Sequence, residues 1–264
     1  MKADLNGKVI VITGGSGGIG RAMGRRFASE GASVVLADIA EEPGASLVEE
    51  IRAGGGSAIF VKCDISDQSQ VENLAAETEK TYGRTDGLIN NVGVNCRAGE
   101  RVPIDQYTFE AWDRIIKINL NGTYFCSRTF VTGMVKRKSG AIINISSTMG
   151  VTAHRGQSAF VTTKAGIINF TRSMALELAP HNIRVNSISP GNLDYSGGLP
   201  EESGYAQLAV SPERVLDHIP LKRFGTGQDI AATAAFLLDD DASYYTGHNF
   251  VCDGGWLCGC HRDW

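Results

Sequence analysis

The sequence predicts one α/β domain over residues 1–264, built as a doubly wound, seven-stranded parallel sheet with helices on both faces. Seven short runs rich in β-branched and apolar residues alternate with helix-length segments along the chain, which is the pattern of repeated strand–helix–strand units. Most of these runs are almost continuously apolar, as in strands that are buried on both faces. No internal repeat, low-complexity segment or linker divides the chain, so a single domain is expected.

The expected strands are separated by intervals of helix length. They occupy residues 8–12, 32–37, 58–61, 87–90, 141–145, 184–188 and 249–251. Two of the intervening helices are clearest. One lies within residues 108–136, and the other runs from about Ser158 to Ala179 and ends before Pro180. Both carry more apolar residues than one sheet face would cover, so they make either a wide core contact or, as we favour, contacts with a second subunit.

Composition and charge exclude several classes of protein. The chain has 25 Lys and Arg against 29 Asp and Glu, a net charge of −4 without long blocks of either sign, so nucleic acid is not an expected partner. No stretch reaches the roughly eighteen apolar residues of a membrane helix, so we expect a cytoplasmic protein with no membrane partner. Cys258, Cys260 and His261 lie close together but lack a second ligand pair, so no metal site is expected.

The segment after the first expected strand has the chemistry of a phosphate-binding turn. It reads Thr13-Gly14-Gly15-Ser16-Gly17-Gly18-Ile19-Gly20 and opens a helix. Without side chains, the backbone can approach a diphosphate, whose charge then lies against the N–H groups and the positive end of the helix dipole. A glycine-rich connection without a ligand is the alternative. The residues expected to hold the diphosphate are Gly14, Ser16, Gly18, Ile19 and Gly20.

Two aspartates follow the next two strands. Asp38 closes the second strand, where a carboxylate can accept hydrogen bonds from the ribose hydroxyls of adenosine, although it could also be a plain turn residue. Its charge would repel a 2′-phosphate, and the neighbouring Gly17 and Ile39 are uncharged, so NAD is favoured over NADP. Asp64, after the third strand, is a weaker candidate for contact with the adenine edge.

With these residues and others further along, the chain resembles the short-chain dehydrogenase/reductase family from Leu5 to Gly255. The motifs are Thr13-Gly14-x-x-x-Gly18-x-Gly20, Asp38, Asp64, Asn90-Asn91-Val92-Gly93, Asn119, Asn144-Ile145-Ser146-Ser147, Lys164, Pro190-Gly191 and Asp253-Gly254-Gly255. The resemblance implies a Rossmann-type domain, a homotetramer, and hydride transfer between NAD and a small alcohol or ketone. It also implies cofactor contacts from Ile39, Cys63, Asp64, Ile65, Asn91, Gly93, Lys164, Pro190 and Gly191.

The resemblance implies that Ser147 hydrogen-bonds the substrate oxygen, that Lys164 binds the nicotinamide ribose and that Asn119 holds a water. The family's Tyr-x-x-x-Lys motif reads Phe160-x-x-x-Lys164 here, in register with Ser147. A phenol at position 160 would share a helix face with Lys164, whose charge would lower the phenol pKa and suit it to general acid–base catalysis. Phenylalanine lacks the titrating oxygen, so hydride transfer is expected to be very slow.

Three explanations for Phe160 stay open. The favoured one is an engineered replacement of tyrosine in an otherwise intact dehydrogenase. The second is a naturally silent NAD-binding sensor or scaffold protein. The third is a rerouted mechanism in which another group, such as Tyr195 or His154, moves the proton.

The substrate is expected above the loops that follow Gly93, Ser147 and Gly191, because α/β sheets bind ligands at the carboxyl ends of their strands. These loops are polar, which favours a sugar, a polyol or a hydroxy acid. Tyr195 also stands where the family often has the threonine that contacts the nicotinamide carboxamide. Arg262 or Trp264 in the tail either completes a partner's pocket or belongs to a frayed end. The expected substrate residues are Asn95, Arg97, His154, Arg155, Gln157 and Tyr195.

Overall fold

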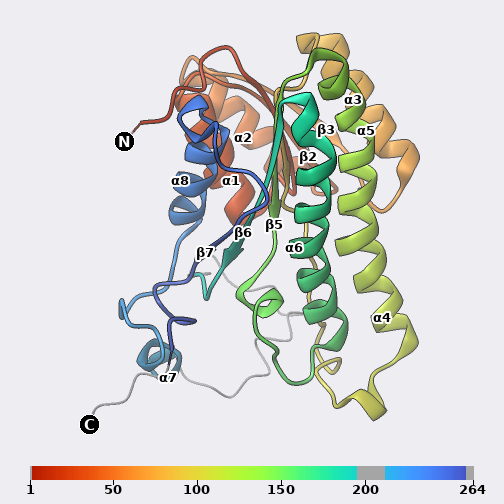
Figure 1. Cartoon of the computed structure of the whole chain (residues 1–264), viewed down its shortest axis with the longest axis vertical. Helices are drawn as coiled ribbons and strands as arrows, with labels where there is room; N and C mark the ends of the chain where they lie inside the picture. The colour runs from red at the N-terminus through yellow and green to blue at the C-terminus, as the bar shows by residue number, and fades with distance from the viewer. Residues whose placement is uncertain (1, 195–211, 260–264) are drawn as a thin grey trace.

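The computed structural model describes residues 2–194 and 212–259, and it confirms the predicted fold class. Its centre is one seven-stranded sheet with helices on both faces (Figure 1). Every strand pairing is parallel. The strands are β1 Val9–Thr13, β2 Ser33–Asp38, β3 Ser57–Lys62, β4 Gly87–Asn90, β5 Gly140–Ile145, β6 Ile183–Pro190 and β7 Asn249–Cys252.

The helices form two layers that bury opposite faces of the sheet. Ile10 and Ile12 of β1 pack in the core beneath α1, α2 and α8, whereas Val11 packs in the core beneath α3, α5 and α6. Burial on both faces explains why the strands read as apolar runs. The helices are α1 Gly18–Ser29, α2 Glu41–Ala53, α3 Gln68–Tyr82, α4 Phe109–Ile115, α5 Gly122–Arg137, α6 Ser158–Leu178, α7 Pro212–Asp217 and α8 Gly227–Leu238.

The strand order is β3-β2-β1-β4-β5-β6-β7. From β1 the chain first winds outward through β2 and β3, and then returns to place β4 on the other side of β1. The order therefore reverses between β1 and β4. In open α/β sheets, ligands bind outside the carboxyl ends of the strands at such a reversal, which is where the glycine-rich turn lies.

The helix predicted within residues 108–136 is not regular throughout. Between α4 and α5 the chain forms one π-helical stretch, Ile116–Asn121, so the backbone widens in the middle of a continuous helical segment. The Thr123 hydroxyl donates to the carbonyl oxygen of Asn119 at 2.7 Å. Such π-helical turns are frequent at functional sites, and this one carries Asn119.

Several large apolar side chains on the α4–α6 side face solvent. Phe109 is 85% exposed, Leu176 is 80% exposed and Tyr124 is 50% exposed, while the Tyr124 ring lies against Phe170 with 6.4 Å between centroids. This side of the molecule therefore exposes apolar surface, and whether a second subunit covers it stays a prediction. Among the described residues, no helix meets the length and apolarity needed to cross a bilayer.

Candidate active site

The glycine-rich turn leaves β1 and enters α1 through backbone conformations that suit glycine. Gly14 has φ of +67°, and a Cβ there would lie 2.9 Å from Nδ2 of Asn91. A Cβ on Gly20 would collide with the carbonyl oxygen of Gly14. The Asn91 amide donates to the carbonyl oxygens of Thr13 and Gly14, both at 3.0 Å, and so ties the end of β4 to the turn. Larger side chains would force this turn apart.

The first turn of α1 has no side-chain cap. Its N-cap is Gly17, which has no side chain to accept a hydrogen bond from the first N–H groups, and a Cβ on Gly18 would meet open space. The N–H groups of such a helix end have no partner within the helix and attract anions. The turn therefore fits the diphosphate of a dinucleotide.

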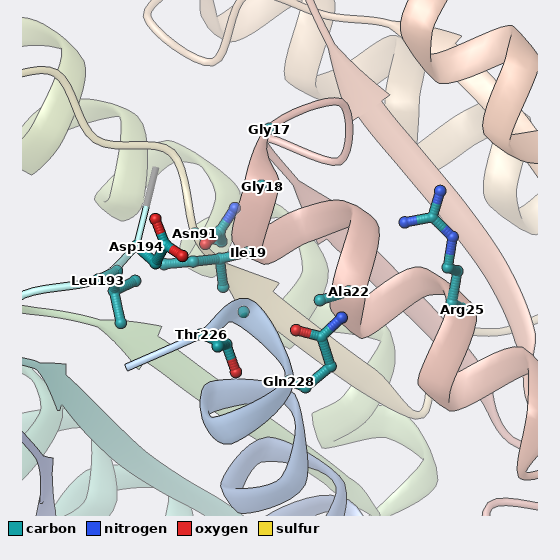
Figure 2. Close-up of a pocket in the computed structure, with 11 residues that line it drawn as sticks. Gly17, Gly18, Ile19, Ala22, Arg25, Asn91, Leu193, Asp194, Thr226 and Gln228 are labelled. Atoms are coloured by element: carbon teal, nitrogen blue, oxygen red, sulfur yellow. The ribbon is translucent and has the colours of Figure 1, made fainter. Parts of the chain in front are cut away.

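A cavity of about 380 Å³ opens beside this helix end. Figure 2 shows that its wall comes from the first turns of α1 and α8 and from the segment after β6. Helix α8 differs from α1, because Thr226 and Asp229 form a reciprocal capping box that satisfies its N-terminus. The lining residues are Gly17, Gly18, Ile19, Ala22, Arg25, Asn91, Leu193, Asp194, Thr226, Gly227 and Gln228.

Most of these lining residues could not be anticipated from the sequence. Gly18, Ile19 and Asn91 were predicted, and the loop after Gly191 was expected at the site, although Leu193 and Asp194 were not named as contacts and the α8 wall was not anticipated. A Cβ on Gly227 would lie 2.9 Å from Cβ of Ala22, which shows how closely α8 packs on α1. The Thr-x-x-Asp spacing at Thr226 is a readable sign of a helix start, but nothing in it indicates which helix lies next to it.

Asp38 lies at the end of β2 beside the glycine-rich turn. Its Oδ2 accepts a hydrogen bond from the Ser16 backbone N–H and its Oδ1 accepts one from the Ala40 N–H, both at 3.0 Å. These two bonds fix the orientation of the carboxylate. Each of its oxygens keeps a further lone pair, which can accept a hydrogen bond from a ribose hydroxyl. The side chain of Ile39 is 67% exposed and brings no charge to this edge.

The residues after β3 offer mainly their backbone and one carboxylate. The side chains of Cys63 and Ile65 are 2% and 3% exposed and point into the core, where burial raises the pKa of the Cys63 thiol to about 11. Asp64 is partly buried, and its Oδ1 accepts from the Ser66 N–H at 2.9 Å. Any contact from Cys63 or Ile65 to a cofactor is thus restricted to main-chain atoms.

Lys164 projects from α6 to the end of β5. Its Nζ donates to the carbonyl oxygen of Ile145 at 2.8 Å, the side chain is buried, and a Cβ on Gly93 would lie 2.9 Å from Nζ. Burial lowers the Lys164 pKa to about 8, because the charged form loses its hydration. The Phe160 ring, one turn earlier, has its centroid 5.7 Å from Nζ, a cation–π contact.

Phe160 lies at the position where the family resemblance implies a tyrosine. Its ring is partly buried in a small cluster with Cys96, Tyr107, Ile115 and Ala159. The shared helix face of positions 160 and 164 is confirmed by the contact between the ring and the ammonium. The site therefore holds the cation that would activate a phenol, but a ring without an oxygen.

Ser147 begins the short 3-10 turn Thr148–Gly150 that follows β5. Its Oγ accepts from the Met149 N–H at 3.1 Å, so the hydroxyl proton stays available to another acceptor. This turn packs on α6, since a Cβ on Gly150 would lie 2.6 Å from the carbonyl carbon of Lys164. The Ser146 hydroxyl also donates to the Lys164 carbonyl oxygen at 2.8 Å. Ser147 and Lys164 are thus fixed relative to each other.

Asn119 is fully buried in the π-helical stretch. Its side-chain oxygen accepts from the Val94 N–H at 2.8 Å, and its Nδ2 donates to the Val94 carbonyl oxygen at 2.9 Å and to Thr163 Oγ1 at 3.3 Å. The side chain therefore holds the loop after β4 against α6. The water contact implied by the family resemblance stays a prediction.

Two of the three predicted substrate loops lie together. Cys96 Sγ is 3.4 Å from the Tyr107 hydroxyl and 3.8 Å from the Gly156 carbonyl oxygen, which joins the loop after β4 to the segment before α6. Gln157 is fully buried, its Nε2 lies 3.3 Å from His154 Nδ1, and its Oε1 has no hydrogen-bond partner in the described structure. Cys96 lies in a loop that was expected to carry the substrate, whereas Tyr107 was not among the predicted site residues.

The remaining predicted substrate residues differ in exposure. The side chains of Arg97 and Arg155 are exposed, and Asn95 uses its Oδ1 to accept from the Cys96 N–H at 2.7 Å. Pro190 and Gly191 close β6, and a Cβ on Gly191 would lie 2.7 Å from Cα of Asp253. Tyr195, Cys260, His261, Arg262 and Trp264 lie outside the described residues. Within residues 2–194 and 212–259, no group of three or more metal-ligating side chains is found.

Comparisons with known proteins match this geometry. A family model described as enoyl-(acyl carrier protein) reductase matches residues 14–257. An uncharacterized oxidoreductase of Thermotoga maritima is 40% identical over 255 residues, which cover 95% of this chain and 96% of that protein. The crystal structure of levodione reductase is similar with a TM-score of 0.89 and 32% identity, over 97% of this chain and 99% of that one.

The crystal structure of NAD⁺-bound xylitol dehydrogenase is similar with a TM-score of 0.87 and 30% identity, over 95% of this chain and 99% of that one. Fold, motif positions and sequence identity thus agree along almost the whole chain. The chain belongs to the short-chain dehydrogenase/reductase family of oxidoreductases, whose members use NAD or NADP.

Proposed function

We propose that this protein is an NAD-dependent alcohol dehydrogenase or ketoreductase that interconverts a polar secondary alcohol and its ketone, and that phenylalanine at position 160 makes it a very slow catalyst. One observation carries the proposal. The buried ammonium of Lys164 lies over the Phe160 ring, beside the turn that carries Ser147. This is the arrangement that would lower the pKa of a phenol at position 160.

The residues present fit a nicotinamide dinucleotide. The uncapped N–H groups of α1 would hold its diphosphate, Asp38 would accept from its adenosine ribose, and Lys164 would donate to its nicotinamide ribose. When bound, the nicotinamide supplies the acceptor or the donor of hydride. The Lys164 ammonium has two N–H groups beyond the one given to Ile145, so it can hold the ribose without leaving the backbone.

Ser147 would orient the substrate oxygen. Its Oγ uses a lone pair on the Met149 N–H, which leaves its proton free to donate to a carbonyl or alkoxide oxygen. With tyrosine at position 160, a phenol activated by Lys164 would exchange the substrate's proton. With phenylalanine that exchange has no group at this position to perform it, so the rate should fall by about two to four orders of magnitude.

NAD rather than NADP is the proposed cofactor. The fixed carboxylate of Asp38 would lie where a 2′-phosphate would have to fit, and the adjacent Ile39 offers no positive charge to compensate. The similar xylitol dehydrogenase structure contains NAD⁺, which agrees with this choice.

A sugar, polyol or hydroxy acid is the proposed substrate class. Two kinds of group favour this class. Gln157 Oε1 has no hydrogen-bond partner in the described structure and could accept from a substrate hydroxyl, beside His154. The exposed Arg97 and Arg155 could bind hydroxyl or carboxylate groups. Xylitol, after which one of the similar dehydrogenases is named, is a polyol. We also propose that the enzyme is a cytoplasmic homotetramer, because Leu176, Tyr124 and Phe109 present apolar surface to solvent.

The test restores the missing oxygen. Phe160→Tyr should raise the rate of NAD reduction with a panel of polyols, sugars and hydroxy acids by about 10²- to 10⁴-fold. Phe170→Tyr is the matched control, since it adds the same oxygen to the same helix at a partly buried ring that packs against the core beneath α5. It should leave the low rate unchanged. Brisk dehydrogenation by the unaltered chain would contradict the role given to Phe160.

A sensor or scaffold protein is the second candidate, favoured by the combination of an intact cofactor cradle with a missing proton carrier. It predicts that NAD binds the protein with phenylalanine at position 160 and that Phe160→Tyr gains no activity with any alcohol in the panel. Calorimetric titration with NAD alongside the activity assay separates the two functions.

A further inference from the structure

The wall of the cavity opposite the α1 N-terminus is a rigid segment that carries one carboxylate. After β6, Leu193 forms a parallel bridge with Gly225. The Asp194 N–H donates to the Gly225 carbonyl oxygen at 2.7 Å, and the Gly225 N–H donates to the Asn192 carbonyl oxygen at 3.0 Å. These bonds fix the backbone at Asp194. Its side chain lines the cavity together with Ile19 and Asn91 (Figure 2).

Among residues 2–194 and 212–259, no basic side chain pairs with this carboxylate. In the part of the chain that the structure describes, the Asp194 side chain makes no hydrogen bond or ion pair. Arg25 is the cationic side chain among the lining residues, and it is engaged elsewhere. Its Nε and Nη2 donate to the two carboxylate oxygens of Glu50 at 2.6 and 2.8 Å. In Figure 2 the guanidinium lies on the far side of the cavity from Asp194.

The topology determines which part of a dinucleotide would meet Asp194. With the diphosphate at the α1 N-terminus, the adenosine half extends toward Asp38, which ends β2 on one side of β1. The other half must then extend over β4, β5 and β6 on the opposite side, toward Lys164. Asp194 follows β6, so it belongs to the nicotinamide side of the cavity.

We propose that Asp194 discriminates between the oxidised and the reduced cofactor by its charge. The nicotinamide ring is positively charged in NAD⁺ and neutral in NADH, whereas the remainder of the molecule is the same in both. An unpaired carboxylate on the nicotinamide side therefore stabilises bound NAD⁺ selectively. This rests on the proposed use of NAD, and it adds a residue that sets the balance between bound NAD⁺ and bound NADH.

The expected size follows from the exposure of Asp194. Two unit charges about 4 Å apart attract by about 1 kcal/mol in water and by more in a low-dielectric site. Because Asp194 is exposed, the lower figure applies. Removing the charge should lower the preference for NAD⁺ over NADH by about fivefold, which corresponds to about 1 kcal/mol. Any repulsion between Asp194 and the diphosphate at the α1 N-terminus is common to both forms and cancels in this ratio.

The experiment is a set of binding titrations on the full chain without any substrate. Dissociation constants for NAD⁺ and for NADH are measured by calorimetry for the parent, for Asp194→Asn and for Asp194→Glu. The asparagine variant keeps the size of the side chain and one acceptor oxygen but replaces the other oxygen by an NH₂ group and loses the charge, whereas the glutamate variant keeps the charge. Glu79→Gln removes the same charge from the exposed face of α3 and is the matched control.

The proposal expects about a fivefold fall in NAD⁺ preference for Asp194→Asn alone, and a smaller difference at high salt. An unchanged ratio of the NAD⁺ and NADH dissociation constants in Asp194→Asn would overturn it, whether both affinities rise, fall or stay the same. A loss of preference in Asp194→Glu equal to that in Asp194→Asn would do the same. If the parent binds neither NAD⁺ nor NADH, the proposed function itself fails, which is a different and recognisable result.

Discussion

Lys164 should make the stability of the fold depend on pH in the alkaline range. Its side chain is 3% exposed, and burial lowers its pKa from 10.5 to about 8. Between these values the unfolded chain binds a proton that the folded chain does not bind, so the free energy of unfolding rises as the pH rises from about 8 to about 10.5. Below about pH 8 both states are protonated and the full penalty of the buried charge applies. The pKa difference corresponds to about 3 kcal/mol.

Lys164→Met is the matched perturbation, because it keeps an unbranched side chain and removes the titrating group. Urea unfolding of both proteins between about pH 7 and pH 10.5 gives the difference in free energy of unfolding, in which other titrating groups cancel. The parent should gain about 3 kcal/mol relative to the variant across this range. At neutral pH the variant should be more stable than the parent by about 2 kcal/mol. It avoids the penalty of about 3 kcal/mol for the buried charge and loses about 1 kcal/mol from the hydrogen bond between Lys164 and the Ile145 carbonyl oxygen. Parallel pH curves for the two proteins would refute the reasoning.

Two further predictions concern the cofactor and the assembly. Asp38→Asn should lower the dissociation constant for NADP relative to NAD by about tenfold, because a fixed charge no longer repels the 2′-phosphate. Fluorescence titration with both cofactors measures the ratio of the two dissociation constants, and an unchanged ratio would show that Asp38 does not determine the preference for NAD. Leu176→Glu should dissociate the proposed tetramer in sedimentation experiments, because it places a charge on exposed apolar surface of α6. Ser46→Glu on the exposed side of α2 is its control, and parent-like sedimentation of both variants would exclude α6 from the interface.

The sheet could be predicted from the sequence because its signal is local. Each strand is an apolar run, and the residues of β1 are buried on both faces. The turn after β1 was equally readable, since Gly14 and Gly20 occupy positions where a Cβ would clash. The face shared by Phe160 and Lys164 follows directly from the period of the α-helix and is seen in their contact.

Other parts of the site depend on packing between distant segments. Asn119 was predicted, but its bonds to Val94 were not, because they require the π-helical stretch Ile116–Asn121 inside an apolar pattern that reads as one helix. Asp194 enters the cavity only because α8 packs on α1 through Gly227 and because Gly225 fixes the segment after β6. No period or motif in the sequence encodes those neighbours.

The two helix ends at the cavity have opposite electrostatic character. At the start of helix α8 the N–H groups of Thr226 and Asp229 are bonded within the capping box, and the Asp229 carboxylate is also paired with Arg223. The start of helix α1 has no such cap at Gly17. The phosphates of an entering dinucleotide therefore find more unbonded N–H groups at α1 than at α8. Removing the Thr226 side chain would free an N–H group of α8 at the same opening, where it would compete with α1 for the phosphates.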